Sequence, residues 1–307
     1  MDWLLVVVGF ALLMSGGEVV VQGAVVIANR MRVPPLLIGF TIVAVGTSLP
    51  ELAVSLEAVA GGQPDLAIGG VIGSNVANVM LVLGTASMLG AASNPGAGVR
   101  RDAKAMMMAS FILLGAVYFG SIGPEFGAGM LICLVGYYAY SYINSEEEDS
   151  EIEENWVPDN IMIASLVTIV GGLLIWKGAD FLIEGATGIA TSMGISEAVI
   201  GLSIVALGTS LPELAVTIVA GLRGQGGVAV GNVLGSNMMN ILGILGTTAL
   251  IGGGIAIDPG FSERDIWVML LTSGMVAAML LDDREIGPRT GLAMVAGYIL
   301  YMTYLYL

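Results

Sequence analysis

Long apolar runs, separated by short polar or charged segments, follow one another along almost the whole chain. A helix needs about 20 apolar residues to cross a bilayer, and most of these runs reach that length. Glycines, prolines and charged clusters mark the breaks between them. The pattern predicts ten membrane-spanning helices, near residues 3–27, 34–60, 66–91, 104–120, 125–144, 160–189, 197–221, 227–252, 265–281 and 290–307.

The composition supports an all-α polytopic membrane protein. Of the 307 residues, 56% are hydrophobic and 11% are charged, whereas soluble domains average about 25% charged residues. The N-terminus, MDWLLVVV, lacks the basic segment of a cleavable signal, so the first run is expected to be a spanning helix. A single cysteine excludes an internal disulfide. The net charge of −15 is partly local, because seven acids lie between Glu146 and Glu154.

The chain contains an internal repeat with an offset of 162 residues. The stretch GTSLPELAV at 46–54 recurs unchanged at 208–216, and GSNVAN at 73–78 recurs as GSNMMN at 235–240. Each copy holds five predicted spans, an odd number, so the second copy enters the membrane from the opposite side. We therefore expect two inverted five-helix repeats, 1–144 and 160–307, joined by an acidic linker at 145–159. Such repeats are typical of secondary transporters.

Basic residues predict the orientation of the chain. With the N-terminus outside, eight of them fall in inner loops and one, Arg264, falls in an outer loop. The positive-inside rule favours this arrangement, which puts both termini outside the cell membrane and the acidic linker in the cytoplasm. The eight basic residues of the inner loops are Arg30, Arg32, Arg100, Arg101, Lys104, Arg223, Arg284 and Arg289.

Lys177 lies within the sixth span, three residues before Asp180, and an ion pair between them is expected.

Glu51 and Glu213 occupy equivalent positions deep in the second and seventh spans. A charge at the bilayer centre costs roughly 2.5–3.5 kcal/mol on insertion scales, so two such carboxylates need a partner. Lys177 cannot serve both symmetrically, but a bound cation can. The alternative is that the glutamates are protonated and hydrogen-bonded to neighbouring helices. Pro50 and Pro212, one residue earlier, interrupt each helix and free backbone carbonyls.

Oxygen-bearing side chains surround the two glutamates in the sequence. Thr47, Ser48, Thr209 and Ser210 lie one turn before them. Carboxylates, hydroxyls and carbonyls suit Ca²⁺ and Na⁺, and the absence of histidine argues against a zinc or copper site. The sequence has neither a nucleophile–base pair nor a GxxxxGK[ST] motif, so we expect neither an enzyme nor direct ATP coupling.

The second motif places a serine and an asparagine on one helix face in each copy. Ser74 and Asn78 are four residues apart, and so are Ser236 and Asn240. Small residues in the same spans permit close helix packing. The remaining asparagines of the motif, at 75 and 237, can also be explained as links between helices.

GTSLPEL paired with GSN-x-x-N in two inverted halves resembles the sodium/calcium exchangers of the Ca²⁺/cation antiporter superfamily, especially their compact archaeal and bacterial members. The resemblance covers nearly the whole chain. It implies that four core spans enclose cation sites at mid-membrane, while the first and sixth spans slide across them. The implied ligands are Glu51 and Glu213 for both ions, carbonyls of Thr47 and Thr209 for Ca²⁺, Ser48, Ser74, Ser210, Ser236 and carbonyls of Ala44 and Ala206 for Na⁺, with Asn78 and Asn240 in the middle.

One position departs from part of the family. Some relatives, including the potassium-dependent branch, carry aspartate where this chain has Asn240. The resemblance therefore implies K⁺-independent exchange with a formal site charge of −2, and a ratio of three Na⁺ to one Ca²⁺ would be electrogenic. Na⁺ and Ca²⁺ are the expected substrates, without a cofactor, a nucleic acid or an obligatory protein partner. Ca²⁺/H⁺ antiport on the same fold, a cation channel and a non-transporting scaffold remain as alternatives.

Overall fold

The computed structural model describes residues 1–90, 92, 96, 98–145, 155–194, 206–282 and 286–305. Most of the acidic linker and the first part of the predicted seventh span lie outside these ranges. Helices make up nearly all of the described chain. They are α1 (Asp2–Met31), α2 (Pro35–Ile38), η1 (Gly39–Val43), α3 (Ala44–Thr47), α4 (Leu49–Ala60), α5 (Pro64–Ala77), η2 (Asn78–Leu83), α6 (Gly84–Met88), α7 (Val99–Phe119), α8 (Pro124–Ile143), α9 (Ile161–Ser192), α11 (Ala206–Gly208), α12 (Leu211–Leu222), α13 (Gly226–Met238), η4 (Met239–Ile244), α14 (Leu245–Gly252), η5 (Pro259–Ser262), α15 (Asp265–Leu281) and α16 (Pro288–Leu305).

The molecule is an all-helical, polytopic membrane protein. Within the described ranges, seven helices are long and apolar enough to cross a bilayer, and the bent pair Pro35–Thr47 and Leu49–Ala60 adds an eighth if it forms one span. The ends of the helices agree with the predicted runs to within a few residues, apart from α7, which begins at Val99 rather than near residue 104. Two-residue strands, β1 (Ser121–Ile122) and β2 (Ile255–Ala256), form a short antiparallel ladder at one end of the bundle.

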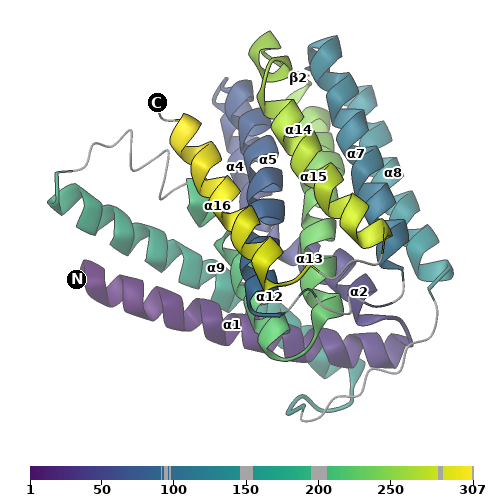
Figure 1. Cartoon of the computed structure of the whole chain (residues 1–307), viewed down its shortest axis with the longest axis vertical. Helices are drawn as coiled ribbons and strands as arrows, with labels where there is room; N and C mark the ends of the chain where they lie inside the picture. The colour runs from purple at the N-terminus through teal and green to yellow at the C-terminus, as the bar shows by residue number, and fades with distance from the viewer. Residues whose placement is uncertain are drawn as a thin grey trace.

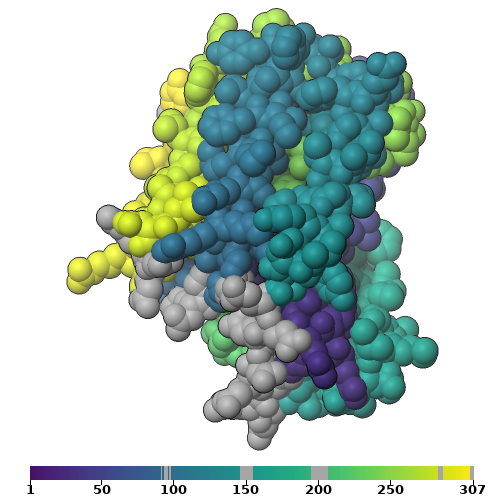
Figure 2. Space-filling model, turned by 90° about the vertical axis from the view of Figure 1, so that its right-hand side faces the viewer, coloured from purple at the N-terminus to yellow at the C-terminus, as the bar shows by residue number. Residues whose placement is uncertain are grey.

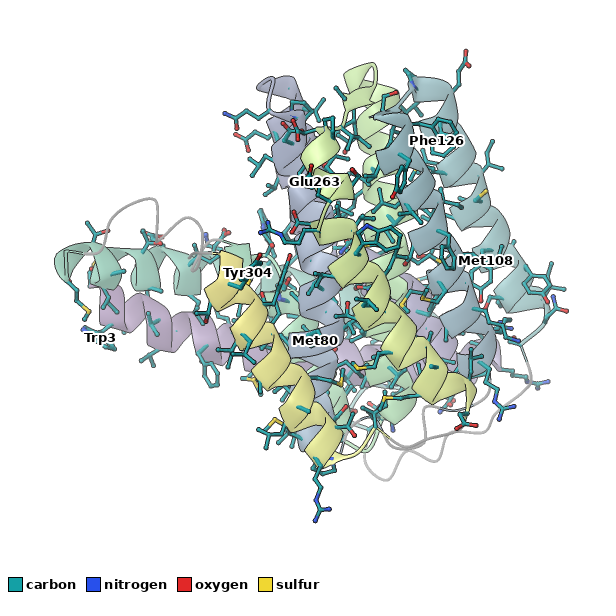
Figure 3. All side chains as sticks on the ribbon, turned by 45° about the horizontal axis from the view of Figure 1, so that its top comes forward. Trp3, Met80, Met108, Phe126, Glu263 and Tyr304 are labelled. Carbon is teal, nitrogen blue, oxygen red and sulfur yellow. The ribbon has the colours of Figure 1, made fainter. Side chains whose placement is uncertain are left out.

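Two long helices, α1 and α9, lie side by side and extend away from the bundle, obliquely to its other helices (Figure 1). Trp3 marks the free end of α1, far from Phe126 on the bundle (Figure 3). Glycines allow the two backbones to touch. A Cβ atom on Gly16 would lie 2.9 Å from the carbonyl oxygen of Gly171, and one on Gly9 would lie 2.7 Å from that of Gly178. The pair is therefore antiparallel and tightly packed.

The helix that continues from α13 through η4 to α14 forms the centre of the bundle and is buried on all sides. Small residues bring it against the second span: a Cβ atom on Gly39 would lie 2.6 Å from the carbonyl oxygen of Val228. Phe40 and Leu36 of the second span are completely buried in the same core. This close backbone packing fixes the position of α13 relative to the break in the second span.

A cluster of arginine, aspartate and tyrosine occurs in both halves of the chain. In the first half, Tyr137 on α8 donates to Asp102 on α7 at 2.6 Å, and Arg101 Nε donates to the same oxygen at 3.0 Å. In the second half, Tyr301 on α16 and Arg264 contact Asp265 at 3.3 and 2.9 Å. These bonds tie the outer helices to each other. Figure 2 shows α7 and α8 on the surface of the upper part of one face of the molecule.

Candidate cation site

The two GTSLPELAV segments interrupt their helices in the same way. Ser48 has φ −87° and ψ 7°, Ser210 has φ −89° and ψ 2°, and a new helix begins directly after each. In the second span the two helical pieces are bent by 44°. The predicted interruption of the helix at Pro50 is confirmed by the break at Ser48, and Pro50 lies in the first turn of α4, where N–H groups have no partner within the helix. The same applies to Pro212 in α12.

Glu51 and Glu213 therefore lie in the first turns of α4 and α12. The N-terminus of a helix carries partial positive charge, which favours a carboxylate there. The two glutamates are 8% and 1% exposed, respectively. Neither forms an ion pair with lysine or arginine in the part of the chain that the structure describes. The pair therefore lacks a positive counter-charge from the described protein.

A hydroxyl group from the second span contacts Glu213. Ser48 Oγ donates to Glu213 Oε1 at 3.2 Å. The Thr47 hydroxyl lies 3.4 Å from Ser236 Oγ and 3.3 Å from the carbonyl oxygen of Ala44. The second, seventh and eighth spans thus meet at one point, formed by residues far apart in sequence.

Asn78 and Asn240 lie where two central spans change from α- to π-helix. Asn78 is the first residue of η2, Asn240 is the second residue of η4, and both are 1% exposed. Several buried polar atoms of this region have no hydrogen-bond partner among the described residues: Glu51 Oε2, Glu213 Oε2, Ser210 Oγ, Asn78 Oδ1, and Oδ1 and Nδ2 of Asn240. Leaving such atoms unpaired costs about 1–3 kcal/mol each, so the cluster is suited to a bound polar ligand.

The other predicted residues divide into three groups. Ser74 is buried, like Ser236. Thr209 is half-buried and has a partner of its own, while the side chain of Ala206 lies outside the described part. Asn75 and Asn237 contact peripheral helices instead, since their Nδ2 atoms lie 3.8 Å from the sulfurs of Met269 and Met106. Their geometry fits the interpretation as links between helices.

A cleft separates the α1–α9 pair from the break in the second span. It is lined by Gly46, Thr47 and Pro50 of the second span, by Thr168, Gly172 and Trp176 of α9, and by Pro212 of α12. Gly46 itself has open space where a side chain would stand. The cleft brings Thr47, one of the predicted ligands, to the border of the cluster.

Two contacts of this region are absent from the sequence prediction. Asn232 bonds to Thr47, to Thr217 and to the backbone of Glu213. Glu18 on α1 forms an ion pair at 2.8 Å with Arg223, which follows α12. The repeat itself carried a signal for both, because Gly70 and Gly61 stand at the positions equivalent to Asn232 and Arg223. The predicted pair of Lys177 and Asp180 is confirmed, at 3.4 Å.

Comparisons with known proteins agree on one protein family. A family model described as "Sodium/calcium exchanger protein" matches residues 1–143 and 163–307. The putative antiporter CaxA of Alkalimonas amylolytica is 33% identical over 98% of this chain and 95% of its own length. The inner membrane protein YrbG of Escherichia coli K12 is 33% identical over 98% of this chain and 96% of its own. The sodium/calcium exchanger MaX1 of Methanosarcina acetivorans is 28% identical over 99% and 98%, respectively.

Solved structures of the sodium-calcium exchanger NCX_Mj have the same fold. The form soaked with zero Na⁺ and Ca²⁺ superposes with a TM-score of 0.85 at 28% identity, and the match covers 99% of this chain and 98% of that chain. The form soaked with 2.5 mM Na⁺ and 0.1 mM Ca²⁺ gives a TM-score of 0.84 at 28% identity over 98% and 97%, respectively.

Proposed function

The chain belongs to the sodium/calcium exchanger family, and on this basis we propose that it exchanges Na⁺ for Ca²⁺ across the cell membrane by alternating access. It is a transporter of this family, a cation exchanger and not an enzyme. The observation that carries the proposal is the pair of buried glutamates, Glu51 and Glu213, which have no cationic partner among the described residues and lie beside unpartnered hydroxyl and amide atoms.

We infer an architecture of ten spans, arranged as inverted repeats at 1–144 and 160–307 with the linker 145–159 between them. The antiparallel packing of the equivalent helices α1 and α9 supports it, as do the identical breaks at Ser48 and Ser210. The basic residues of the loops favour extracellular termini and a cytoplasmic linker. The relative YrbG is named as an inner membrane protein, which accords with a place in the cell membrane.

The proposed ligands are those of the sequence prediction. The two glutamates bind either ion, and competition for these carboxylates makes Ca²⁺ and Na⁺ exclude each other. The backbone carbonyls of Thr47 and Thr209 complete the Ca²⁺ site. The site serines and the carbonyls of Ala44 and Ala206 serve Na⁺, with Asn78 and Asn240 between the glutamates. Hard oxygen donors of this kind suit both cations.

Alternating access follows from the position of the α1–α9 pair. In this conformation α1 packs against α12, where a Cβ atom on Gly17 would lie 3.1 Å from the carbonyl oxygen of Ala215. On the side of α9, a cleft reaches Thr47. Sliding of the tightly packed pair across the bundle would close this cleft and open the opposite side. The glutamates would then face the two sides of the membrane in turn.

The neutral side chain of Asn240 leaves a formal site charge of −2, from which we infer exchange that does not need K⁺. One Ca²⁺ neutralises this charge and three Na⁺ leave +1. A 3:1 exchange therefore moves one net charge, and a membrane potential of 100 mV would change its driving force by about 2.3 kcal/mol.

The decisive experiment is uptake of radioactive Ca²⁺ into proteoliposomes. Vesicles loaded with Na⁺ are compared with vesicles loaded with K⁺, with the pH clamped on both sides. We expect uptake only with internal Na⁺, and none in Glu51→Gln or Glu213→Gln, each of which removes half of the site charge. Size-exclusion chromatography of both variants serves as the control for folding.

Other outcomes would lead to other functions. Uptake that ignores Na⁺ but follows an imposed pH gradient would indicate Ca²⁺/H⁺ antiport, in which protons replace Na⁺ on the same carboxylates. Uptake that needs neither gradient would indicate a channel. Full transport in either glutamine variant would refute the assignment of the site.

A further inference from the structure

Asn232 is a completely buried side chain at the junction of three spans. Its Nδ2 donates to Thr217 Oγ1 at 3.0 Å and to the backbone carbonyl of Glu213 at 3.3 Å, while its Oδ1 accepts from Thr47 Oγ1 at 3.3 Å. The carbonyl of Glu213 can only accept a hydrogen bond, which fixes the orientation of the amide. Asn232 therefore links α13 to α12 and to the break of the second span.

The first repeat has no counterpart of this side chain. The equivalents of Thr47, Glu213 and Thr217 are Thr209, Glu51 and Ser55, but the equivalent of Asn232 is Gly70. Gly70 is exposed, and a Cβ atom built there meets nothing within 4 Å. Ser55 is bonded elsewhere, to Thr248 Oγ1 at 3.0 Å. Every partner of Asn232 is thus duplicated in the chain, but Asn232 itself is not.

The two glutamates show the same asymmetry between the repeats, because Glu213 is held more firmly than Glu51. Glu213 is 1% exposed, has its backbone held by Asn232, and accepts a hydrogen bond from Ser48 of the second span. Glu51 is 8% exposed, and its backbone is held by no counterpart of Asn232, because Gly70 stands at the equivalent position. The duplicated motif therefore produces one anchored and one less constrained carboxylate.

We propose that Asn232 is a positioning residue that fixes Glu213 as the rigid half of the cation site and leaves Glu51 as the half that adjusts when ions enter and leave. The inference rests on the proposed function, since it assumes that these carboxylates bind the transported ions. Asn232 touches no ion itself. It acts by holding the backbone of Glu213 and the hydroxyl of Thr47 in place before the ion arrives, which lowers the ordering cost of binding.

The test is the Ca²⁺ affinity of the purified, full-length protein in Na⁺-free detergent solution, measured by calorimetry, together with the kinetics of uptake. Asn232→Gly gives this position the residue of the first repeat. We expect its Kd and its KM for Ca²⁺ to rise about tenfold, the order of one or two lost hydrogen bonds, while the maximal rate at saturating Ca²⁺ stays within about twofold of the wild type.

Two matched pairs of variants control the experiment. Thr217→Val removes one acceptor of Asn232 without changing the size of the side chain, and we expect it to raise the Kd about threefold, less than the full loss of the amide. Ser55→Ala, at the equivalent position, and Gly70→Asn, the reciprocal exchange, contact neither Asn232 nor Glu213 and should leave the Kd unchanged. Thr217→Val also keeps the test decisive if Asn232→Gly does not fold.

The outcomes are distinguishable. A merely structural role would lower the melting temperature of Asn232→Gly and leave the Kd of the folded protein unchanged, and this result would overturn the inference. An equal rise of Kd in Ser55→Ala and Thr217→Val would overturn it as well. Wild-type protein that binds neither Ca²⁺ nor Na⁺ would overturn the proposed function and this inference with it.

Discussion

The packing of α1 against α9 leads to a prediction with an internal control, because two adjacent glycines on α9 have opposite surroundings. A Cβ atom on Gly171 would lie 2.8 Å from both the backbone nitrogen and Cγ2 of Val20, and 3.0 Å from the carbonyl oxygen of Gly16. A Cβ atom on Gly172 would meet nothing within 4 Å. Gly171→Ala therefore adds a methyl group where α1 is already in close contact, whereas Gly172→Ala adds the same group to open space.

The size of the effect follows from these distances. Ordinary contacts begin at 3.4 Å, so the methyl of Gly171→Ala must displace the backbone of α1 by roughly 0.6 Å. Overpacking of this kind costs about 1–3 kcal/mol. Replacing glycine by alanine inside a helix stabilises the folded protein by about 0.5–1 kcal/mol in either variant, because alanine loses less backbone entropy on folding. Because this gain is common to both, the difference between them isolates the clash and should be about 1–3 kcal/mol in favour of Gly172→Ala.

Thermal unfolding of the two purified variants in the same detergent measures this difference. For a chain longer than 250 residues, 1 kcal/mol corresponds to about 2 °C, so the melting temperature of Gly171→Ala should lie roughly 2–6 °C below that of Gly172→Ala. Equal melting temperatures would mean that α1 and α9 separate at no cost. The pair could then not be regarded as a unit that slides across the bundle.

Three further predictions concern charged groups. Tyr137→Phe should lower the melting temperature more than Tyr301→Phe, because the first removes a 2.6 Å bond to a fully buried aspartate, worth about 1.5–3 kcal/mol, and the second a 3.3 Å bond to a partly exposed one. Arg223→Gln removes the ion pair with Glu18, which is worth up to about 1 kcal/mol, and should lower the population of this conformation relative to the other by up to about fivefold. Maleimide labelling of a cysteine engineered on α12 measures this population. Asn240→Asp changes the site charge to −3, so Ca²⁺–Ca²⁺ exchange, electroneutral in the wild type, should generate transient currents on a solid-supported membrane.

Local patterns predicted a large part of the fold. The lengths of the apolar runs gave the spans because the bilayer sets the length of a helix, and Pro50 predicted the break that the structure places at Ser48. The π-helical segments η1, η2 and η4 were not predicted. Their i→i+5 bonds have no characteristic residue pattern, and the packing of neighbouring spans decides where they form.

The candidate site was predicted at the level of motifs and not at the level of contacts. Glu213 was chosen as a carboxylate deep in a span and Ser48 as a hydroxyl one turn before Glu51, but the bond between them joins residues 165 positions apart. Asn232 was missed because nothing in its local sequence distinguishes it from a residue that only packs helices. Comparison of the two repeats would have singled it out, since glycine replaces it in the other copy.

The differences between the repeats also affect the relative free energies of the two conformations in the proposed alternating-access cycle. In an inverted-repeat transporter the second conformation is reached when the halves exchange roles, so each contact made here by one half would be made there by the other. The ion pair of Glu18 with Arg223 would become a contact between Asp180 and Gly61, which has no charge to offer. The conformation described here therefore has an attraction across α1 and α12 that the proposed counterpart would lack. Two copies of the candidate site motif consequently need not give equally populated conformations, and Arg223 is one residue through which we expect their ratio to be set.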